Sequence, residues 1–190
     1  DNGGVQHASS GHNNTLDPGI NNRESGRTYS RDPEAYRTVA PDGTCWPLTL
    51  VGDGPLREGI KRRVRKGKIN GVRFTGFVSD EERNKHIRNA KWMVTPPNTN
   101  EDLGLTPLEA RSVGVPCIVS EDGGLKETGG PHALRCRPGC SESLARALRE
   151  AIEMPEDRYA RLSELSKEGL EDYVRPLDDY AVAYRELLRK

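Results

Sequence analysis

The chain has 190 residues, enough for one domain of ordinary size with a buried core. Its 29 acidic and 29 basic side chains are interspersed, so no strong field favours nucleic acid as a partner. The sequence shows no apolar run long enough to span a membrane and no basic-then-apolar leader, which predicts a cytoplasmic protein without a membrane span.

The first part of the chain is polar. Residues 1–24 are rich in Asn, Gly, Ser and His, and their few apolar residues follow neither period 2 nor period 3.6. We therefore expect a flexible or disordered arm at residues 1–24 and a single domain at residues 25–190. Hydrophobic residues make up 33% of the chain and are scarcest before residue 45, so that region is expected to bury little.

From Trp46 onward, short apolar runs alternate with helical patterns. The expected strands cover residues 47–51, 72–74, 92–95, 116–119 and 133–136. The expected helices between them cover residues 56–65, 80–90 and 106–113. Beyond Pro138 leucines recur at helical spacing and no strand is expected. This order predicts an α/β fold, a Rossmann-like parallel sheet flanked by helices, with a helical C-terminal tail.

One helix start is signalled especially clearly. Ser79 is followed three residues later by Glu82, the spacing of a capping box, and Asp80 and Glu81 would occupy the positive first turn. The sequence therefore predicts that a helix begins at Asp80.

The cysteines do not indicate a metal site. Cys136 and Cys140, with His132 nearby, lack the second ligand pair that a zinc site needs, so free thiols are expected.

Two acidic residues bracket a glycine-containing turn at an expected helix start. Glu101 and Glu109 are eight positions apart, and Gly104 lies between them. Backbone N–H groups at a helix N-terminus favour a diphosphate, while carboxylates accept hydrogen bonds from hydroxyl groups. The pattern therefore favours a site that holds a sugar nucleotide from both ends.

Four further blocks surround this acidic pair. They are residues 50–56 (LVGDGPL), 72–79 (VRFTGFVS), 114–120 (GVPCIVS) and 123–127 (GGLKE). Together with Glu101 and Glu109, they resemble the E-x7-E motif and its neighbouring elements in the retaining, nucleotide-sugar-dependent glycosyltransferases of family 4. The resemblance implies the C-terminal half of a GT-B fold, the donor-binding half, with the N-terminal acceptor domain absent from this chain.

The resemblance also implies roles for the acidic pair. Glu109 would accept hydrogen bonds from the ribose hydroxyls, although an ordinary carboxylate in a first helical turn would also be favourable. Glu101 would act as the catalytic acidic residue, beside the anomeric carbon of the transferred sugar. Backbone N–H groups would bind the sugar and phosphates at Leu103, Gly104, Leu105 and Thr106. Asp102 departs from the family pattern and brings a third negative charge.

Other donor contacts follow from the same resemblance. Arg27 and Arg31 would hold the diphosphate, although Arg31 stands one position short of the family's lysine and both could be solvated loop residues. Gly52 would let its loop approach the ligand, or simply form a tight turn. The loop that contacts the base would contain Gly76, Phe77 and Val78, and the amides of Gly123 and Gly124 would approach the sugar.

These assignments predict a hexosyltransferase. It would transfer a hexose from a UDP- or GDP-sugar to a glycan, lipid or small-molecule acceptor bound through the missing N-terminal domain. No metal and no other cofactor is expected, because a helix N-terminus and basic side chains can balance the diphosphate. The alternative is a non-catalytic module that binds a nucleotide sugar or a partner, which the missing acceptor half and Asp102 favour. A sugar-nucleotide epimerase on the same scaffold is disfavoured by the E-x7-E spacing.

Overall fold

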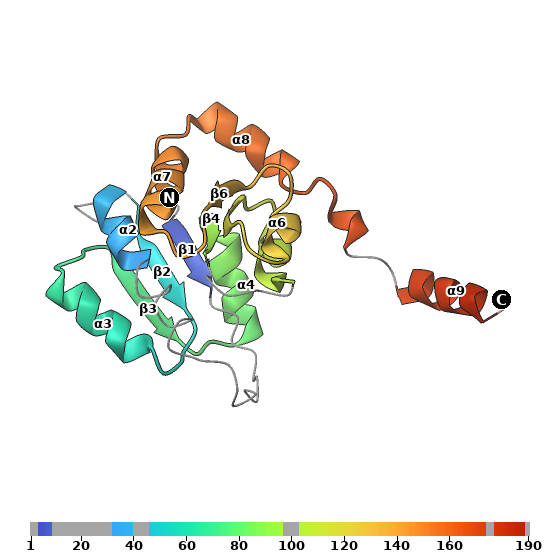
Figure 1. Cartoon of the computed structure of the whole chain (residues 1–190), viewed down its shortest axis with the longest axis horizontal. Coiled ribbons are helices and arrows are strands. Elements are labelled where there is room, and N and C mark those ends of the chain that lie inside the picture. Colours follow the sequence, from blue (N-terminus) through green and yellow to red (C-terminus); the bar gives the residue numbers. More distant parts are fainter. Residues whose placement is uncertain (1–3, 9–31, 40–45, 97–102, 174–176, 189–190) are drawn as a thin grey trace.

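The computed structural model describes residues 4–8, 32–39, 46–96, 103–173 and 177–188. These residues form a parallel β-sheet with helices packed against it (Figure 1). The strands are β1 (Gly4–Ala8), β2 (Leu48–Val51), β3 (Val72–Gly76), β4 (Ala90–Thr95), β5 (Cys117–Ser120) and β6 (Leu134–Cys136). Their order across the sheet is β3-β2-β1-β4-β5-β6, and every neighbouring pair is parallel. The expected Rossmann-like sheet is confirmed.

The helices follow the strands in regular alternation. They are α2 (Asp32–Val39), α3 (Arg57–Lys66), α4 (Asp80–Arg88), α5 (Leu105–Ser112), α6 (Leu125–Thr128), α7 (Ser141–Ile152), α8 (Glu156–Leu165), the short 3-10 helix η1 (Leu170–Asp172) and α9 (Leu177–Leu187). The helical C-terminal tail is therefore confirmed, although α7 belongs to the α/β body because it packs on α2 and β6. Figure 1 shows α9 set apart from that body.

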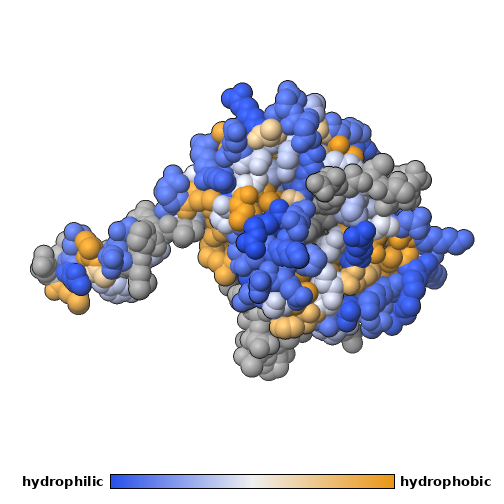
Figure 2. Space-filling model, turned by 180° about the vertical axis from the view of Figure 1, so that it is seen from behind, coloured by the Kyte–Doolittle hydropathy of each residue, from blue (hydrophilic) through white to orange (hydrophobic). Residues whose placement is uncertain are grey.

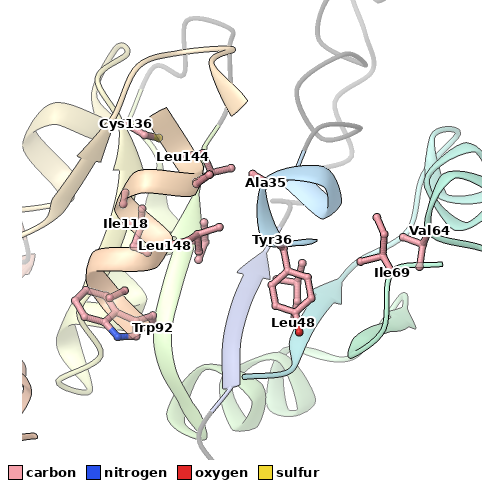
Figure 3. Close-up of a cluster of buried hydrophobic side chains, with 14 residues drawn as sticks. Ala35, Tyr36, Leu48, Val64, Ile69, Trp92, Ile118, Cys136, Leu144 and Leu148 are labelled. Carbon is pink, nitrogen blue, oxygen red and sulfur yellow. The ribbon is translucent and has the colours of Figure 1, made fainter. Parts of the chain in front are cut away.

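Two apolar cores lie on opposite faces of the sheet. Trp92 and Val94 of β4 share one core with α2, α3 and α7, whereas Met93 between them belongs to a second core with α4, α5 and α6. This alternation follows from the period of two along a strand. Tyr36, Leu144 and Leu148 close over Trp92 and Leu48 in the first core (Figure 3). Burial on both faces explains why β4 and β5 read as continuous apolar runs.

The N-terminal part of the chain differs from the sequence-based expectation. Gly4–Ala8 is β1, paired with β2 on one side and β4 on the other, so the prediction of an arm throughout residues 1–24 is wrong for these five residues. The domain therefore includes β1, and its predicted start at residue 25 is also wrong. Pairing on both sides stabilises a strand that has little intrinsic pattern of its own. Residues 9–24 lie outside the described residues.

The expectation that the region before residue 45 buries little is wrong for helix α2. Helix α2 places Ala35 and Tyr36 against α7, and Tyr36 is only 1% exposed. Its hydroxyl donates a 2.6 Å hydrogen bond to the carbonyl oxygen of Trp46. Two well-placed side chains thus anchor an otherwise polar helix, which average composition cannot indicate.

The outer surface carries several exposed apolar side chains on α9. Val182 and Leu187 are more than half exposed, and Figure 2 shows apolar residues on this separate helix. None of the helices in the described part of the chain has the length and apolar character needed to cross a membrane.

Helix α4 begins with the predicted capping box. The Oγ atom of Ser79 accepts a 3.2 Å hydrogen bond from the backbone N–H of Glu82, whose carboxylate accepts one from the backbone N–H of Ser79. Replacing Ser79 by alanine should lower the free energy of unfolding by about 1 kcal/mol, because the N–H of Glu82 loses its side-chain acceptor. Urea denaturation measures this change, and Ser79→Thr is the control that keeps a hydroxyl. Equal stability of the alanine variant and the parent would contradict the capping role.

Candidate functional site

The described residues among those singled out in the sequence lie at the carboxyl edge of the sheet. In an open α/β sheet, ligands bind outside the carboxyl ends of the strands, at the point where the strand order reverses. Here that point lies between β1 and β4, since the chain runs outward to β3 from β1 and outward to β6 from β4. Glu101, Asp102, Arg27 and Arg31 lie outside the described residues.

Helix α5 begins beside this point, after the loop that follows β4. Gly104 precedes the helix with φ 73° and ψ 80°, a left-handed conformation that favours glycine. The backbone N–H groups of Leu105 and Thr106 have no acceptor within a helix that begins there, and Pro107 has no N–H group. Thr106 is buried, whereas Leu103 and Leu105 are almost half exposed. This helix end therefore offers N–H donors at the switch point.

Glu109 lies one turn further along α5. The helix begins at Leu105 and has no acidic residue in its first turn, so the alternative of a first-turn carboxylate is wrong. The Nη2 atom of Arg83 donates to the Oε1 atom of Glu109 at 2.9 Å, and the Glu109 side chain is 36% exposed. The Nη1 atom of Arg83 donates to the Oδ1 atom of Asp80 at 2.8 Å. Glu109 is therefore held by an arginine from the neighbouring helix α4.

A backbone hydrogen bond joins the carboxyl ends of β2 and β3. The backbone N–H of Gly52 donates to the carbonyl oxygen of Gly76 at 3.0 Å. Both glycines have positive φ, 121° and 74°, so the backbone alone accounts for their identity. Arg57 passes over Gly76 and binds Asp53 at 3.2 Å. The turn thus lies along one side of the site.

The β3–α4 loop adds an exposed aromatic side chain. Phe77 follows Gly76 directly and is 84% exposed, while Val78 is partly buried. An apolar ring this exposed at a ligand-binding edge is available for contact with a flat ligand group.

The turn after β5 closes the opposite side of the edge. Gly123 has a positive φ of 46°, and Gly124 stands at the N-terminus of the short helix α6. Leu125 and Thr128 of α6 are completely buried, which fixes the turn against the second core. Both predicted glycines therefore lie at the same sheet edge as α5.

Two polar residues at this edge were not predicted from the sequence. Thr95 is the last residue of β4, and its hydroxyl is buried without a hydrogen-bond partner in the part of the chain that the structure describes. Arg83 contacts Glu109 from a position 26 residues earlier in the chain. A threonine at a strand end and an arginine after a capping box are ordinary in a sequence. Only the tertiary arrangement shows their relation to the site.

The described cysteines and histidines do not gather into a metal site. Cys117 and Cys140 are free thiols, Cys136 donates to the carbonyl oxygen of Val119 at 3.5 Å, and no cluster of three metal-binding side chains occurs within the described ranges. Burial raises the pKa of Cys117 to about 12, which keeps this thiol protonated and inert. His132 instead contacts Glu168, with 2.8 Å between the ring Nε2 and the carboxylate Oε2.

The fold also occurs in solved structures, one of which is the catalytic domain of a glucosyltransferase. It superposes on Anabaena HepE in complex with UDP-glucose with a TM-score of 0.70 and 19% identity, over 90% of this chain and 44% of that one. It superposes on the catalytic domain of the cholesterol-alpha-glucosyltransferase from Helicobacter pylori with a TM-score of 0.67 and 19% identity, over 90% and 99% of the two chains. These likenesses support the α/β architecture.

Two relatives with similar sequences are a mannosyltransferase and a glucosyltransferase. A GDP-mannose-dependent alpha-(1-6)-phosphatidylinositol dimannoside mannosyltransferase of Mycobacterium tuberculosis is 28% identical over 69% of this chain. A 2-deoxystreptamine glucosyltransferase of Streptomyces kanamyceticus is 30% identical over 68% of this chain. In both cases the match spans 34% of the relative's length.

A family model covers most of the domain. The model for glycosyl transferases group 1 matches residues 34–169, which include β2 to β6 and the edge built around α5. The chain belongs to the glycosyl transferases group 1.

Proposed function

We propose that this chain is the donor-binding domain of a retaining hexosyltransferase that uses a UDP- or GDP-sugar. The observation that carries the proposal is the position of Glu109 on α5, beside the N-terminus that stands at the switch point. Glu109 is four positions after Leu105, which corresponds to about 6 Å along a helix axis. A diphosphate and the ribose joined to it through one methylene group fit that spacing.

The parts of the donor would then occupy successive parts of the edge. The diphosphate would accept hydrogen bonds from the N–H groups of Leu105 and Thr106, where the helix dipole favours negative charge. The ribose hydroxyls would donate to Glu109. The base would extend beyond the ribose toward the β3–α4 loop and Phe77. Arg27 and Arg31 would add positive charge at the diphosphate.

The transferred sugar would lie on the other side of the diphosphate. Glu101 would face it near the anomeric carbon, where positive charge develops as the bond to the diphosphate breaks. Gly123 and Gly124 would approach the same sugar from the β5–α6 turn. Because helix α5 and the arginines balance the leaving diphosphate, no metal ion is needed. The acceptor would bind to a part of the protein outside the 34% of the relatives' length that the match spans.

Calorimetric titration tests the donor site. We expect saturable binding of UDP and UDP-glucose, or of GDP and GDP-mannose, in buffer with a chelator and no divalent metal. Glu109→Gln should weaken this binding at least about tenfold, since a carboxylate that accepts from ribose hydroxyls is lost. Glu164→Gln, an exposed acid on α8, is the control with the same charge change.

Each outcome separates the possible functions. Equal binding by the parent and Glu109→Gln would contradict the ribose role of Glu109. Absence of binding for all four ligands would contradict the donor site itself. Donor binding without hydrolysis or transfer by a protein that also carries the acceptor domain would instead support a non-catalytic binding module.

A further inference from the structure

Arg83 is the arginine that joins helix α4 to the acidic residue of the proposed site. Its guanidinium group lies between the Asp80 carboxylate, 2.8 Å away, and the Glu109 carboxylate, 2.9 Å away. The Arg83 side chain is 34% exposed, and its Nε atom is buried without a hydrogen-bond partner in the described part of the chain. The planar group is therefore fixed at both of its terminal nitrogens.

We propose that Arg83 is a positioning residue that orients the Glu109 carboxylate toward the ribose hydroxyls of the donor. This inference rests on the proposed function. A carboxylate on a helix can rotate about its side-chain bonds, and two adjacent hydroxyls bind it well only when its plane is set. The hydrogen bond from Arg83 to the Oε1 atom of Glu109 sets the plane of this carboxylate. A carboxylate has about four lone-pair sites, so the hydrogen bond from Arg83 is compatible with hydrogen bonds from ribose hydroxyls.

The way α4 begins supports this role. The capping box fixes the first turn of α4, and Asp80 in that turn holds one nitrogen of Arg83 in place. The other nitrogen of Arg83 then reaches across to α5. A rigid helix start therefore determines the position of a side chain on the neighbouring helix, through an arginine that holds both acids at once.

Arg83 contacts the residue proposed to bind the ribose and lies on the helix that follows the loop proposed to face the base. The chain reaches Arg83 from Phe77 through the cap residue Ser79, so a ligand that spans Glu109 and Phe77 would pass the first turn of α4. Any change at Arg83 could alter the general electrostatic attraction for a diphosphate as well as the orientation of Glu109. The experiment must distinguish these two effects.

Two ligands that differ only in the ribose hydroxyls make this distinction. The affinities of UDP and 2′,3′-dideoxy-UDP, and of the corresponding GDP pair, are measured by calorimetry for the parent and for Arg83→Met. Both members of a pair carry the same diphosphate, so a purely electrostatic effect changes both equally. We expect Arg83→Met to weaken binding of the ribose form about fivefold, with little change for the dideoxy form.

Two more variants complete the test. Lys85→Met removes the same charge from an exposed position on the same helix and should leave the ratio of the two affinities unchanged. Arg83→Lys keeps the charge but loses the branched guanidinium group that contacts two carboxylates. Its ratio of affinities for the ribose and dideoxy forms should therefore lie between those of the parent and of Arg83→Met. Thermal unfolding of each variant shows whether α4 remains folded. This pattern would establish that Arg83 acts through Glu109.

Other results would overturn the inference. An unchanged or increased affinity of Arg83→Met for the ribose form would show that Arg83 does not assist Glu109. An equal loss for both members of a pair would assign Arg83 to general electrostatics. The parent protein could bind the ribose form more tightly than the dideoxy form, with the same ratio of affinities in Arg83→Met. In that case only the positioning role of Arg83 would be wrong, and the proposed function would stand. If the parent binds neither nucleotide, the proposed function fails with it.

Discussion

Replacing Arg111 by methionine is expected to lower the free energy of unfolding by about 3–5 kcal/mol. Arg111 is 1% exposed and donates to three backbone carbonyls, those of Ser166, Thr128 and Glu168, at 2.8, 2.7 and 2.6 Å. Methionine fills a similar volume but donates nothing, so these carbonyls lose their donor inside the protein. Part of the cost is offset because the variant no longer buries a charge.

Urea denaturation of both proteins measures this effect. Arg135→Met is the control, because Arg135 donates only one described hydrogen bond, to the carbonyl oxygen of Gly130 at 2.8 Å, and should cost about 1 kcal/mol. Hydrogen exchange should also increase in residues 163–173, which Arg111 ties to α5 and α6. A loss below 1 kcal/mol for Arg111→Met would show that this arginine is not a structural anchor.

The second large effect is expected at Trp92. This residue is completely buried in β4, and its ring packs against Tyr159 with 5.9 Å between the centroids. Trp92→Ala should lower the free energy of unfolding by about 3–5 kcal/mol, because the surrounding core cannot collapse into the space. The indole N–H is buried without a hydrogen-bond partner in the described part of the chain.

That unpaired N–H makes phenylalanine an informative comparison. Trp92→Phe leaves a smaller void and removes a donor whose burial is costly, so the loss should not exceed about 2 kcal/mol. Denaturation curves for the two variants, with equal slopes against urea, measure the difference. Similar losses for alanine and phenylalanine would show that the cavity does not determine the cost.

The sequence predicted the elements whose signals are local. The apolar runs of β4 and β5 are buried on both faces, so they are visible without knowledge of their neighbours. The capping box of Ser79 and Glu82 depends on four consecutive residues and could be read directly. The convergence of the glycine-rich turns and α5 on one edge followed from parallel strands alone.

The features missed from the sequence depend on distant partners. Gly4–Ala8 is a strand because β2 and β4 supply hydrogen bonds on both sides, and its own residues carry no regular pattern. Tyr36 is buried because α7 packs over it. Arg83 reaches Glu109 only after α4 and α5 are placed side by side. The roles of Glu101, Arg27 and Arg31 remain predictions, since these residues lie outside the described part of the chain.

The central position of β1 has a consequence for folding kinetics. The pair β2 and β3 and the group β4 to β6 can each assemble through local crossover helices, but only β1 joins them. In the sheet, Val5 of β1 pairs with Leu48 on one side and with Trp92 on the other, and both partners lie far away in sequence. The insertion of β1 between β2 and β4 is therefore slow. Until β1 inserts, β2 and β4 each present an unpaired edge to other molecules. Aggregation during refolding should therefore compete with the last step of sheet assembly.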